Sequence, residues 1–481
     1  MNIKRWIYNL RHLNLIENNF LIKIQKLDDE KQLIIRGLTS QLSAVKEGSD
    51  ANFNKLKNEN EKLRSEVLYL SDKLCTLKSI LKYKKIIPLK VVFLCEHKSL
   101  WKSFSSLVEN LSKDTRFEVI VINLWCKEYS NDGSYCYTNP HIECLCKNEN
   151  IKVINSYDVK NDSWINLKKI EPDYVFFNRP YDYYRNENYH IKNIAKYSKT
   201  CYIPYGMVII GGDVEKFTFP ENFCSKLYFL FLNSIPLEKN SIDVFSNLKK
   251  LPNLDDEHLL YLGYPGLDNL KNKVDTTVNC KSKKFNILWL PRWNTSEGNC
   301  NFFDYKDILL QYVKKYKNSC CLIFRPHPLC FSNFIKTGEM SQDELDDFKS
   351  NFINEDVAKI DESGNYTDTF LESDVLVADE TSLIAEYFVT KKPIIFCQKI
   401  SHFSSLMKTL VGGLYVVKNK NELLDTLNFL RNGNDPLKEK RKYIIDKYLL
   451  NYGESAAENI KNALISDATE NSYEIEKIKL Q

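Results

Sequence analysis

The stretch from Asp374 to Phe396 reads Asp-Val-Leu-Val-Ala-Asp-Glu-Thr-Ser-Leu-Ile-Ala-Glu-Tyr-Phe-Val-Thr-Lys-Lys-Pro-Ile-Ile-Phe. An apolar run leads into a polar turn at residues 379–382. A segment of helical composition follows, and a second apolar run begins after Lys392-Pro393. This order predicts a strand, a turn, a helix and another strand. It is the repeating unit of an α/β protein with a mainly parallel sheet.

The polar turn in this stretch has the residues of an anion-binding site. Ligands of open α/β sheets lie beyond the carboxyl ends of the strands, and a helix that begins at Thr381 or Ser382 presents free backbone N–H groups there. The two hydroxyls suit a phosphate. Glu386 follows about one helical turn later, within reach of the ribose of a nucleotide whose phosphates lie at the helix start. The acids Asp379 and Glu380 could hold a divalent ion beside a pyrophosphate, although such acids more often cap a helix or line a solvated turn.

A second stretch upstream supports the same site. Leu322-Ile323-Phe324 has the composition of a buried strand, and Arg325-Pro326-His327-Pro328 follows it directly. Arginine suits a bidentate contact with phosphate, and the flanking prolines restrict the backbone that presents the His327 ring. We therefore expect the two stretches to form one pocket. An ordinary loop histidine is the alternative interpretation of His327.

Composition and charge limit the classes of protein and partner. The 481 residues suffice for two or three domains, and 67 basic against 63 acidic residues give a net charge of +4, which predicts no nucleic-acid partner. The 14 cysteines include no Cys-x-x-Cys pair. This spacing favours reduced, structural thiols in a cytoplasmic protein over a zinc or disulfide framework.

The first residues have the composition of neither a signal peptide nor a membrane span. Lys4, Arg5, Trp6 and Arg11 could lie at the anionic inner face of the cytoplasmic membrane. A solvated helix end is the alternative. The expected location is therefore the cytoplasm, with peripheral membrane contact left open.

Residues 1–85 predict a helical region with a coiled coil. Apolar residues fall on a strict heptad, which Asn60 alone interrupts; they are Phe53, Leu56, Leu63, Val67, Leu70, Leu74, Leu77 and Leu81. One Asn at an a position with mostly leucine at d is typical of a parallel two-stranded coiled coil. The chain is thus expected to form a homodimer through this region. A long amphipathic helix packed on its own globular domain is the alternative.

Two α/β domains are expected to follow the helical region. Strand-like runs alternate with helical stretches through residues 86–275 and again through residues 285–430, and residues 431–481 are expected to form C-terminal helices and a tail. The polar segment 131–150 predicts a surface loop. The polar stretch 269–284 predicts a linker between the two domains.

An ordered set of motifs resembles the CDP-glycerol glycerophosphotransferase family, the teichoic-acid polymerase and primase type of enzymes of bacterial wall and capsule synthesis. The set covers residues 260–417, and its pieces are Gly263-Tyr264-Pro265 with Asp268, Leu288-Trp-Leu-Pro291-Arg-Trp293, Arg325-Pro-His327-Pro328, Ser373-Asp374 with Asp379-Glu-Thr-Ser382, Glu386-Tyr387 and Lys392-Pro393. The resemblance implies a GT-B fold, in which two Rossmann-like domains face a cleft. The second domain would hold an activated donor, and the first would hold the acceptor.

The resemblance also implies roles on the donor side. Arg325 and His327 would face the donor pyrophosphate, and a cationic His327 could donate to the leaving phosphate. Thr381 and Ser382 would bind phosphate oxygens, and Glu386 would meet the ribose. Arg292 and Asp379 complete the predicted donor-side set.

Two positions depart from the family pattern. The family places a histidine before a glycine in its first domain, as the base for the acceptor hydroxyl, and the matching pair here is Tyr205-Gly206. A neutral phenol is a poor base at neutral pH. His97, beside Glu96 after the first strand, is the other candidate base. Glu380 stands where the family usually has an aromatic residue.

The expected reaction transfers a glycerol-phosphate or related polyol-phosphate unit from a CDP-activated donor to a hydroxyl of a polymer or lipid-linked acceptor, with CMP as the leaving group. Helix N–H donors, an arginine and an imidazole can stabilise this reaction, so we predict neither a metal nor another cofactor. One alternative is a GT-B glycosyltransferase of capsule or lipooligosaccharide assembly that uses a nucleotide-sugar donor. The other is a non-catalytic coiled-coil scaffold with a degenerate GT-B domain.

Overall fold

The computed structural model divides into two compact units. One comprises residues 1–89, 115–117 and 462–481, and the other comprises residues 90–114 and 118–461. The structure describes residues 26, 29–30, 32–33, 35–37, 62, 88–129, 135–146, 150–207, 217–232, 248, 250–276, 284–296, 298–353, 357–363, 366–398, 403–450, 453 and 455–479.

The predicted N-terminal features fall mostly outside the described residues. The residues described between 26 and 62 are helical. The heptad seam from Phe53 to Leu81 and the basic group at Lys4, Arg5, Trp6 and Arg11 are not among them. The coiled coil, the dimer and the membrane contact therefore stay predictions. None of the helices that the structure describes is long and apolar enough to span a bilayer.

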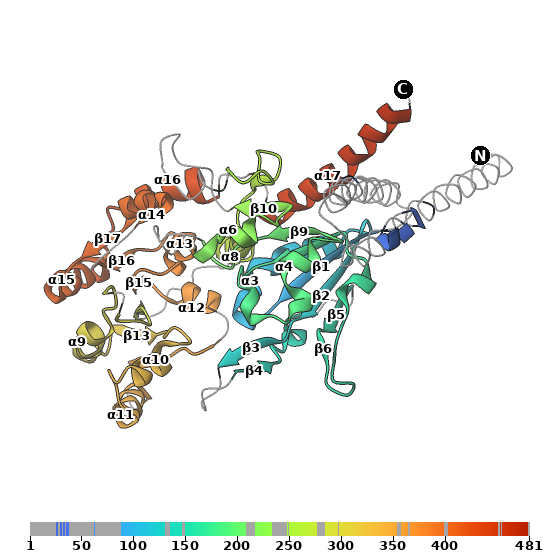
Figure 1. Cartoon of the computed structure of the whole chain (residues 1–481). Helices are drawn as coiled ribbons and strands as arrows, with labels where there is room; N and C mark the ends of the chain where they lie inside the picture. The colour runs from blue at the N-terminus through green and yellow to red at the C-terminus, as the bar shows by residue number, and fades with distance from the viewer. Residues whose placement is uncertain are drawn as a thin grey trace, which may run out of the picture. The chain divides into compact units, whose positions relative to one another are not determined.

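The first sheet has seven strands in the order β11-β10-β9-β8-β1-β2-β5 (Figure 1). The strands are β1 (Leu89–Cys95), β2 (Phe117–Asn123), β5 (Ile151–Asn155), β8 (Tyr174–Phe177), β9 (Lys199–Tyr202), β10 (Phe229–Leu232) and β11 (Leu259–Tyr261). The pairs β2–β5, β1–β8, β8–β9, β9–β10 and β10–β11 are parallel. Most of β1 and β8 is apolar and buried, which is expected for parallel strands that are covered on both faces.

The second sheet has six strands in the order β14-β13-β12-β15-β16-β17, and every neighbouring pair is parallel. The strands are β12 (Phe285–Leu290), β13 (Cys320–Phe324), β14 (Ala358–Ile360), β15 (Val375–Ala378), β16 (Ile394–Cys397) and β17 (Tyr415–Val417). Counted within this sheet, the order is 3-2-1-4-5-6, that of a Rossmann fold. The order reverses between β12 and β15, which is where such sheets bind ligands.

Helices and short hairpins complete the fold. The α-helices are α3 (Lys102–Ser112), α4 (Ile191–Ile194), α6 (Glu221–Cys224), α8 (Pro265–Thr276), α9 (Phe302–Lys315), α10 (Cys330–Lys336), α11 (Gln342–Ile353), α12 (Thr367–Glu372), α13 (Leu383–Phe388), α14 (Ser405–Leu410), α15 (Lys420–Arg431), α16 (Lys438–Ile444) and α17 (Ala456–Lys479). Single turns are η2 (Lys98–Leu100), η3 (Ile142–Leu145), η4 (Leu167–Ile170), η5 (Asp182–Tyr184), η6 (Glu187–Tyr189), η7 (Val411–Gly413) and the π-turn η8 (Ile445–Leu449). The antiparallel pairs are β3 (Cys126–Tyr129) with β4 (Tyr135–Thr138) and β6 (Tyr157–Asp158) with β7 (Ser163–Trp164).

The two-sheet α/β architecture predicted from the alternating runs is confirmed, but two polar segments were interpreted wrongly. The segment 131–150 was expected to be a loop and contains β4 and η3. The stretch 269–284 was expected to be a linker, yet α8 continues to Thr276. Leu267 and Leu270 of α8 are buried, while the polar residues of the same helix lie mostly on its outer face.

Asp268, which follows the Gly263-Tyr264-Pro265 motif, has a structural role. The carboxylate of Asp268 accepts hydrogen bonds from the backbone N–H groups of Ala456 (3.0 Å) and Ala457 (2.9 Å), at the start of α17, and from the Ser106 hydroxyl of α3 (3.2 Å). Burial raises the pKa of Asp268, but these donors oppose the shift. One side chain thus joins α8, α3 and the first turn of α17.

Lys392 caps the C-terminal end of α12. Its ammonium donates to the carbonyl oxygens of Phe370 (3.0 Å), Leu371 (2.6 Å) and Ser373 (2.5 Å). A cation is favourable at a helix C-terminus, where carbonyl groups lack intrahelical partners. Burial lowers the pKa of Lys392 to about 8, so the side chain remains mainly charged at pH 7.

Lys392→Met should lower the free energy of unfolding by about 2 kcal/mol, because the apolar stem is kept while buried carbonyls lose their donor. Urea unfolding followed by circular dichroism measures the change. Lys420→Met is the matched control: Lys420 is exposed, and its loss should change stability by less than about 0.5 kcal/mol. Equal effects of the two substitutions would contradict the structural role of Lys392.

Candidate active site

Three loops meet at the edge of the second sheet where the strand order reverses. They follow β12 at residues 291–301, β13 at residues 325–328 and β15 at residues 379–382. Because the strands are parallel, their carboxyl ends lie at the same edge of the sheet. The sequence placed its candidate donor residues in these loops, and the fold brings the loops together.

Asp379 fixes the loop that follows β12. Its buried carboxylate accepts hydrogen bonds from the backbone N–H groups of Arg292 (2.8 Å) and Asn301 (2.8 Å), and from the Asn301 side-chain amide (2.7 Å). Three donors on one carboxylate hold the two loops in a single arrangement. The structure thus gives Asp379 a positioning role; its contact with a donor phosphate stays a prediction.

Glu380 is turned inward. It is buried, and its carboxylate accepts a hydrogen bond from the Asn299 side chain at 3.1 Å. Its backbone carbonyl accepts from the Arg292 guanidinium at 2.9 Å. The turn therefore fixes Arg292 at two points. The Asp379 carboxylate binds its backbone N–H, and the Glu380 carbonyl binds its guanidinium.

His327 is oriented by its own loop and by an aromatic neighbour. The Leu329 N–H donates to Nδ1 at 3.2 Å, and the ring stacks on Trp293 with centroids 5.7 Å apart. The ring keeps an exposed face. The protein packed around it desolvates the imidazolium and Arg292 repels it, and both effects lower the pKa of His327 to about 4. In the free protein His327 is thus neutral at pH 7, with the proton on Nε2. The cationic His327 expected from the sequence concerns the donor complex and stays a prediction.

Arg325 is paired within the second sheet. Its guanidinium donates to the Asp361 carboxylate at 2.6 Å and to the carbonyl (2.7 Å) and hydroxyl (3.3 Å) of Ser363. Although burial opposes it, hydrogen bonds from Ser363 and Thr369 and the charge of Arg325 hold the pKa of Asp361 below its usual value. The predicted contact of Arg325 with a pyrophosphate would have to share or replace these partners.

The turn at Thr381 and Ser382 reaches the first sheet. Ser382 is the N-cap residue of α13, and the Leu383 N–H donates to the Thr381 hydroxyl at 3.4 Å. A Cβ atom at Gly206 would lie 3.2 Å from the Ser382 hydroxyl oxygen. The loop that carries Tyr205-Gly206 therefore lies close to the predicted phosphate turn.

Tyr205 has a defined position in this contact. Its carbonyl accepts a hydrogen bond from the buried Tyr264 hydroxyl at 2.7 Å, and its own ring is partly exposed. Tyr264 is the aromatic residue of the Gly263-Tyr264-Pro265 motif. This motif thus helps to fix the loop that carries Tyr205, the candidate base.

Glu386 lies at a contact that the sequence did not predict. It is completely buried. One carboxylate oxygen accepts a hydrogen bond from Lys102 Nζ of α3 at 2.6 Å, and the other accepts from the Tyr366 hydroxyl. Lys102 Nζ also lies 4.8 Å from the centroid of the Tyr366 ring. The ribose contact of Glu386 stays a prediction, and a ribose would have to compete with Lys102 or Tyr366.

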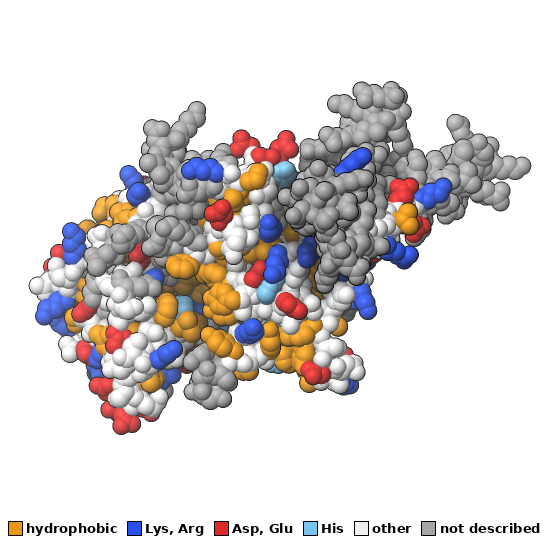
Figure 2. Space-filling view, viewed as in Figure 1, with side chains coloured by type: hydrophobic (Ala, Val, Ile, Leu, Met, Phe, Trp, Pro, Cys, Tyr) orange, Lys and Arg blue, Asp and Glu red, His pale blue; other side chains and the backbone are white. Residues whose placement is uncertain are grey.

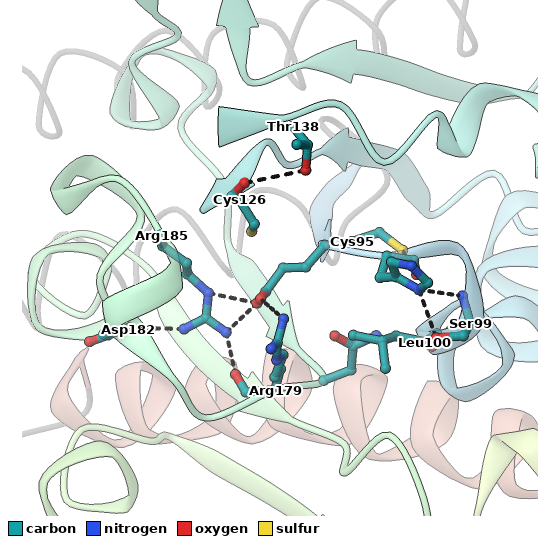
Figure 3. Close-up of polar contacts among 11 residues, drawn as sticks. Cys95, Ser99, Leu100, Cys126, Thr138, Arg179, Asp182 and Arg185 are labelled. Carbon is teal, nitrogen blue, oxygen red and sulfur yellow. Dashed lines mark hydrogen bonds and ion pairs between the residues drawn. The ribbon is translucent and has the colours of Figure 1, made fainter. Parts of the chain in front are cut away.

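The first sheet has its own reversal of strand order, between β1 and β8, and charged residues gather there (Figure 3). The buried carboxylate of Glu96 accepts hydrogen bonds from Arg185 Nε (2.7 Å) and Nη2 and from Arg179 Nη1 (3.3 Å). Arg185 also donates to Asp182 at 2.9 Å. Glu96 is therefore committed to two arginines, which argues against its use as a base.

His97 caps the short helix η2. Its Nδ1 accepts from the Ser99 N–H at 3.1 Å and contacts the Ser99 hydroxyl at 2.7 Å. Desolvation by the surrounding protein, and then Arg179 and Lys98, lower the pKa of His97 against the opposing charge of Glu128. The ring is neutral at pH 7, and its predicted role as a base would have to use a nitrogen that now bears a proton or accepts this bond.

The structure brings several of the predicted residues near one another: Arg292 donates to Asp379 and lies near enough to influence His327 electrostatically, and Ser382 lies close to the loop of Tyr205. His97 lies at the edge of the first sheet, and Glu386 lies behind the turn. Sequence reasoning missed Lys102, Tyr366 and Asn301, whose partners are far away along the chain. Among the described residues no group of three or more His, Cys, Asp or Glu side chains is arranged to hold a metal ion.

A known protein family matches part of this chain. Residues 241–466 match the family described as CDP-Glycerol:Poly(glycerophosphate) glycerophosphotransferase. No curated protein matches the chain significantly in sequence.

Solved structures show the fold. A structure described as a UDP-N-acetylglucosamine 2-epimerase from Listeria monocytogenes has a TM-score of 0.53 and 13% identity over 80% of this chain and 97% of that one. The UDP-GlcNAc 2-epimerase from Neisseria meningitidis has a TM-score of 0.50 and 11% identity over 79% of this chain and 100% of that one. The wall teichoic acid polymerase TagF has a TM-score of 0.49 and 15% identity over 88% of this chain and 99% of that one. Together with the two Rossmann-like sheets, the two epimerase structures show a fold of the GT-B type, as expected.

The family match includes every donor-side residue predicted from the sequence and extends from before the Gly263-Tyr264-Pro265 motif into α17. The match over residues 241–466 to the CDP-glycerol:poly(glycerophosphate) glycerophosphotransferase family confirms the resemblance inferred from the motifs.

Proposed function

We propose that the protein is a transferase that moves a glycerol-phosphate or related polyol-phosphate unit from a CDP-activated donor to an acceptor hydroxyl in wall or capsular polymer synthesis. The family match supports the class of donor. The main structural support is the closeness of Gly206 to Ser382, whose hydroxyl oxygen lies 3.2 Å from where a Cβ at Gly206 would be, because the loop of the predicted acceptor side then lies near the predicted phosphate turn.

In this reaction the acceptor oxygen attacks the β-phosphorus of the donor. A new P–O bond forms, the bond to CMP breaks, and the hydroxyl proton is lost from the acceptor. The bound phosphoryl oxygens would meet the N–H groups at the start of α13, the hydroxyls of Thr381 and Ser382, and the guanidinium of Arg292. Fixed donors of this kind stabilise charge on phosphoryl oxygens without rearranging during the reaction.

His327 would act on the leaving phosphate. Its Nε2–H is the remaining donor of the ring, because Nδ1 accepts from the Leu329 N–H. An anionic pyrophosphate nearby favours the imidazolium, and the pKa of about 4 in the free protein would then rise on binding. The cationic form expected from the sequence would thus arise in the donor complex.

Tyr205 is the better placed of the two candidate bases. Its loop touches Ser382, whereas Nδ1 of His97 is held by the Ser99 N–H. A loose transition state of phosphoryl transfer requires little proton removal before the leaving group departs. A neutral phenol that orients the acceptor hydroxyl is compatible with such a mechanism.

His327→Ala should lower the rate of CMP release from CDP-glycerol by a factor of about 100 or more, because the transition state loses a charge-stabilising donor. The assay separates nucleotide products by chromatography and includes UDP-sugar donors. His141→Asn is the matched control, since His141 is exposed and has a positive φ that asparagine tolerates. Full activity of His327→Ala would favour the scaffold alternative, and release of nucleotide only from UDP-sugars would favour the glycosyltransferase.

Donor affinity should rise about tenfold between pH 7.5 and pH 5.5, because binding would raise the pKa of His327 from about 4 toward its ordinary value and so take up a proton. Calorimetry in buffers of different ionisation enthalpy measures both the affinity and the proton uptake. His327→Asn should abolish this pH dependence. Affinity that is independent of pH in the unmodified protein would contradict a cationic His327 in the complex.

A further inference from the structure

The reversal of strand order in the first sheet is the second place where this fold should bind a ligand. The loops after β1 and β8 leave the sheet there in opposite directions. The donor-side residues lie on the other sheet.

Tyrosine side chains gather at this edge. We define the tyrosine–arginine platform by its residues, which are Tyr135, Arg179, Tyr181, Tyr183 and Tyr184. The rings of Tyr183 and Tyr184 have centroids 4.1 Å apart, and that of Tyr181 lies 5.9 Å from Tyr183. Tyr183 is 63% exposed and Tyr135 66% exposed. Tyr135, from β4, is near enough to influence Tyr183 electrostatically.

A cluster of exposed aromatic side chains beside a cation is a candidate interaction site. Figure 2 shows hydrophobic side chains, a class that there includes tyrosine, gathered near the centre of one face of the molecule with basic and histidine side chains between them. Burial raises the pKa of both Tyr181 and Tyr183, so their phenols stay neutral and can donate as well as accept hydrogen bonds.

Arg179 is the cation of the platform. Its guanidinium carbon lies 3.9 Å from the centroid of the Tyr184 ring, and among the described residues its one hydrogen bond is the long contact of Nη1 with Glu96. Arg185 is different, because it is fully buried and is bound by Glu96, by Asp182 and by the Arg179 carbonyl. Figure 3 shows the two arginines approaching the same carboxylate from different sides.

This arrangement leaves Arg179 with donors for a ligand. Glu96 and Asp182 both bind the buried Arg185, whereas Arg179 is partly exposed, meets Glu96 only at 3.3 Å and is held in place by its stack on Tyr184. A guanidinium has five N–H donors in a planar fork that matches phosphate. A lysine at this position would carry the charge without the fork.

The platform is continuous with the predicted phosphate turn of the second sheet. The phenols of Tyr181 and Tyr205 lie close enough for Tyr205 to contribute, after burial, to the raised pKa of Tyr181. Tyr205 precedes Gly206, which meets the Ser382 hydroxyl. A ligand on the platform would therefore extend past Tyr205 toward the donor site.

We infer that the tyrosine–arginine platform binds the acceptor, and that the acceptor is a chain of sugar or polyol units bearing a phosphate ester. Tyrosine faces pack against the C–H groups of such units, phenols bond their hydroxyls, and Arg179 takes the phosphate. The inference rests on the proposed function only in naming the ligand an acceptor. The binding site itself can be tested without turnover.

Binding of sn-glycerol 3-phosphate and glucose 6-phosphate, each against its unphosphorylated parent, measures the platform directly by NMR titration of the full-length protein. Arg179→Gln should weaken binding of both esters by about tenfold or more, and Tyr183→Ala should weaken it severalfold. The exposed Tyr183 tolerates replacement even where Arg179→Gln disturbs folding.

The matched controls use the same chemistry elsewhere. Arg431 stacks on Tyr316 at 3.6 Å, and Tyr443 is 53% exposed, so Arg431→Gln and Tyr443→Ala should leave ester binding unchanged. Ser382→Ala should also leave it unchanged, because that side chain belongs to the donor side. Loss of ester binding in Ser382→Ala but not in Arg179→Gln would put the ester in the donor site and overturn the inference.

Two further outcomes separate this inference from the proposed function. Ester binding that depends on Arg179, together with no transfer from any CDP-activated donor, would refute the proposed function and leave the platform as a phosphate-ester site. Normal transfer with an unchanged acceptor KM in both Arg179→Gln and Tyr183→Ala would refute the platform and leave the transferase.

Discussion

The hydrogen bonds on Asp379 hold the donor side of this protein together. A parallel sheet with the order 3-2-1-4-5-6 brings the loops after its first and fourth strands to one edge, but it does not fix how those loops fold. The buried carboxylate of Asp379 does so by accepting from Arg292 N and from both nitrogens of Asn301. Arg292, which contributes to the low pKa of His327, takes its position from this bond. Removing one of these donors would leave the buried carboxylate with an unmade hydrogen bond, which would lower the free energy of unfolding.

Contacts between the two sheets define the second constraint. Tyr264 donates to the Tyr205 carbonyl, Gly206 meets Ser382, and Lys102 pairs with the buried Glu386. A buried ion pair is weak evidence for stability, because desolvation offsets the attraction, but it penalises arrangements in which the charges separate. The pair thus favours one relative position of α3 and α13. A donor whose ribose reached Glu386 would compete with this ion pair. It would therefore affect the relative position of α3 and α13 as well as the nucleotide site.

The sequence was most informative where a single segment decides the outcome. Apolar runs followed by polar turns predicted most strands of both sheets, though not β5 or β14. The turn at residues 379–382 was placed at a helix start, as observed for α13. Prediction failed for α8, since a polar amphipathic helix and a linker share the same composition. It also gave no sign that Lys102 and Glu386 meet, because 284 residues separate them and each is an ordinary surface residue type. The charge of His327 depends on packing by Trp293 and on Arg292, and neither effect can be read from the Arg-Pro-His-Pro tetrapeptide.

The reversal of strand order is lined by different kinds of side chain in the two sheets. At the reversal of the second sheet the charged groups are held by hydrogen bonds among loops, and an anion finds N–H donors, hydroxyls and Arg292. At the reversal of the first sheet, Glu96 is already neutralised by Arg185 and Arg179, and tyrosine rings surround the cation. A site rich in donors suits a pyrophosphate, whereas a cation among aromatic faces suits a ligand with both ring-like surface and charge. This difference in lining, more than the shared fold, would give the two halves the distinct ligands that we propose for them.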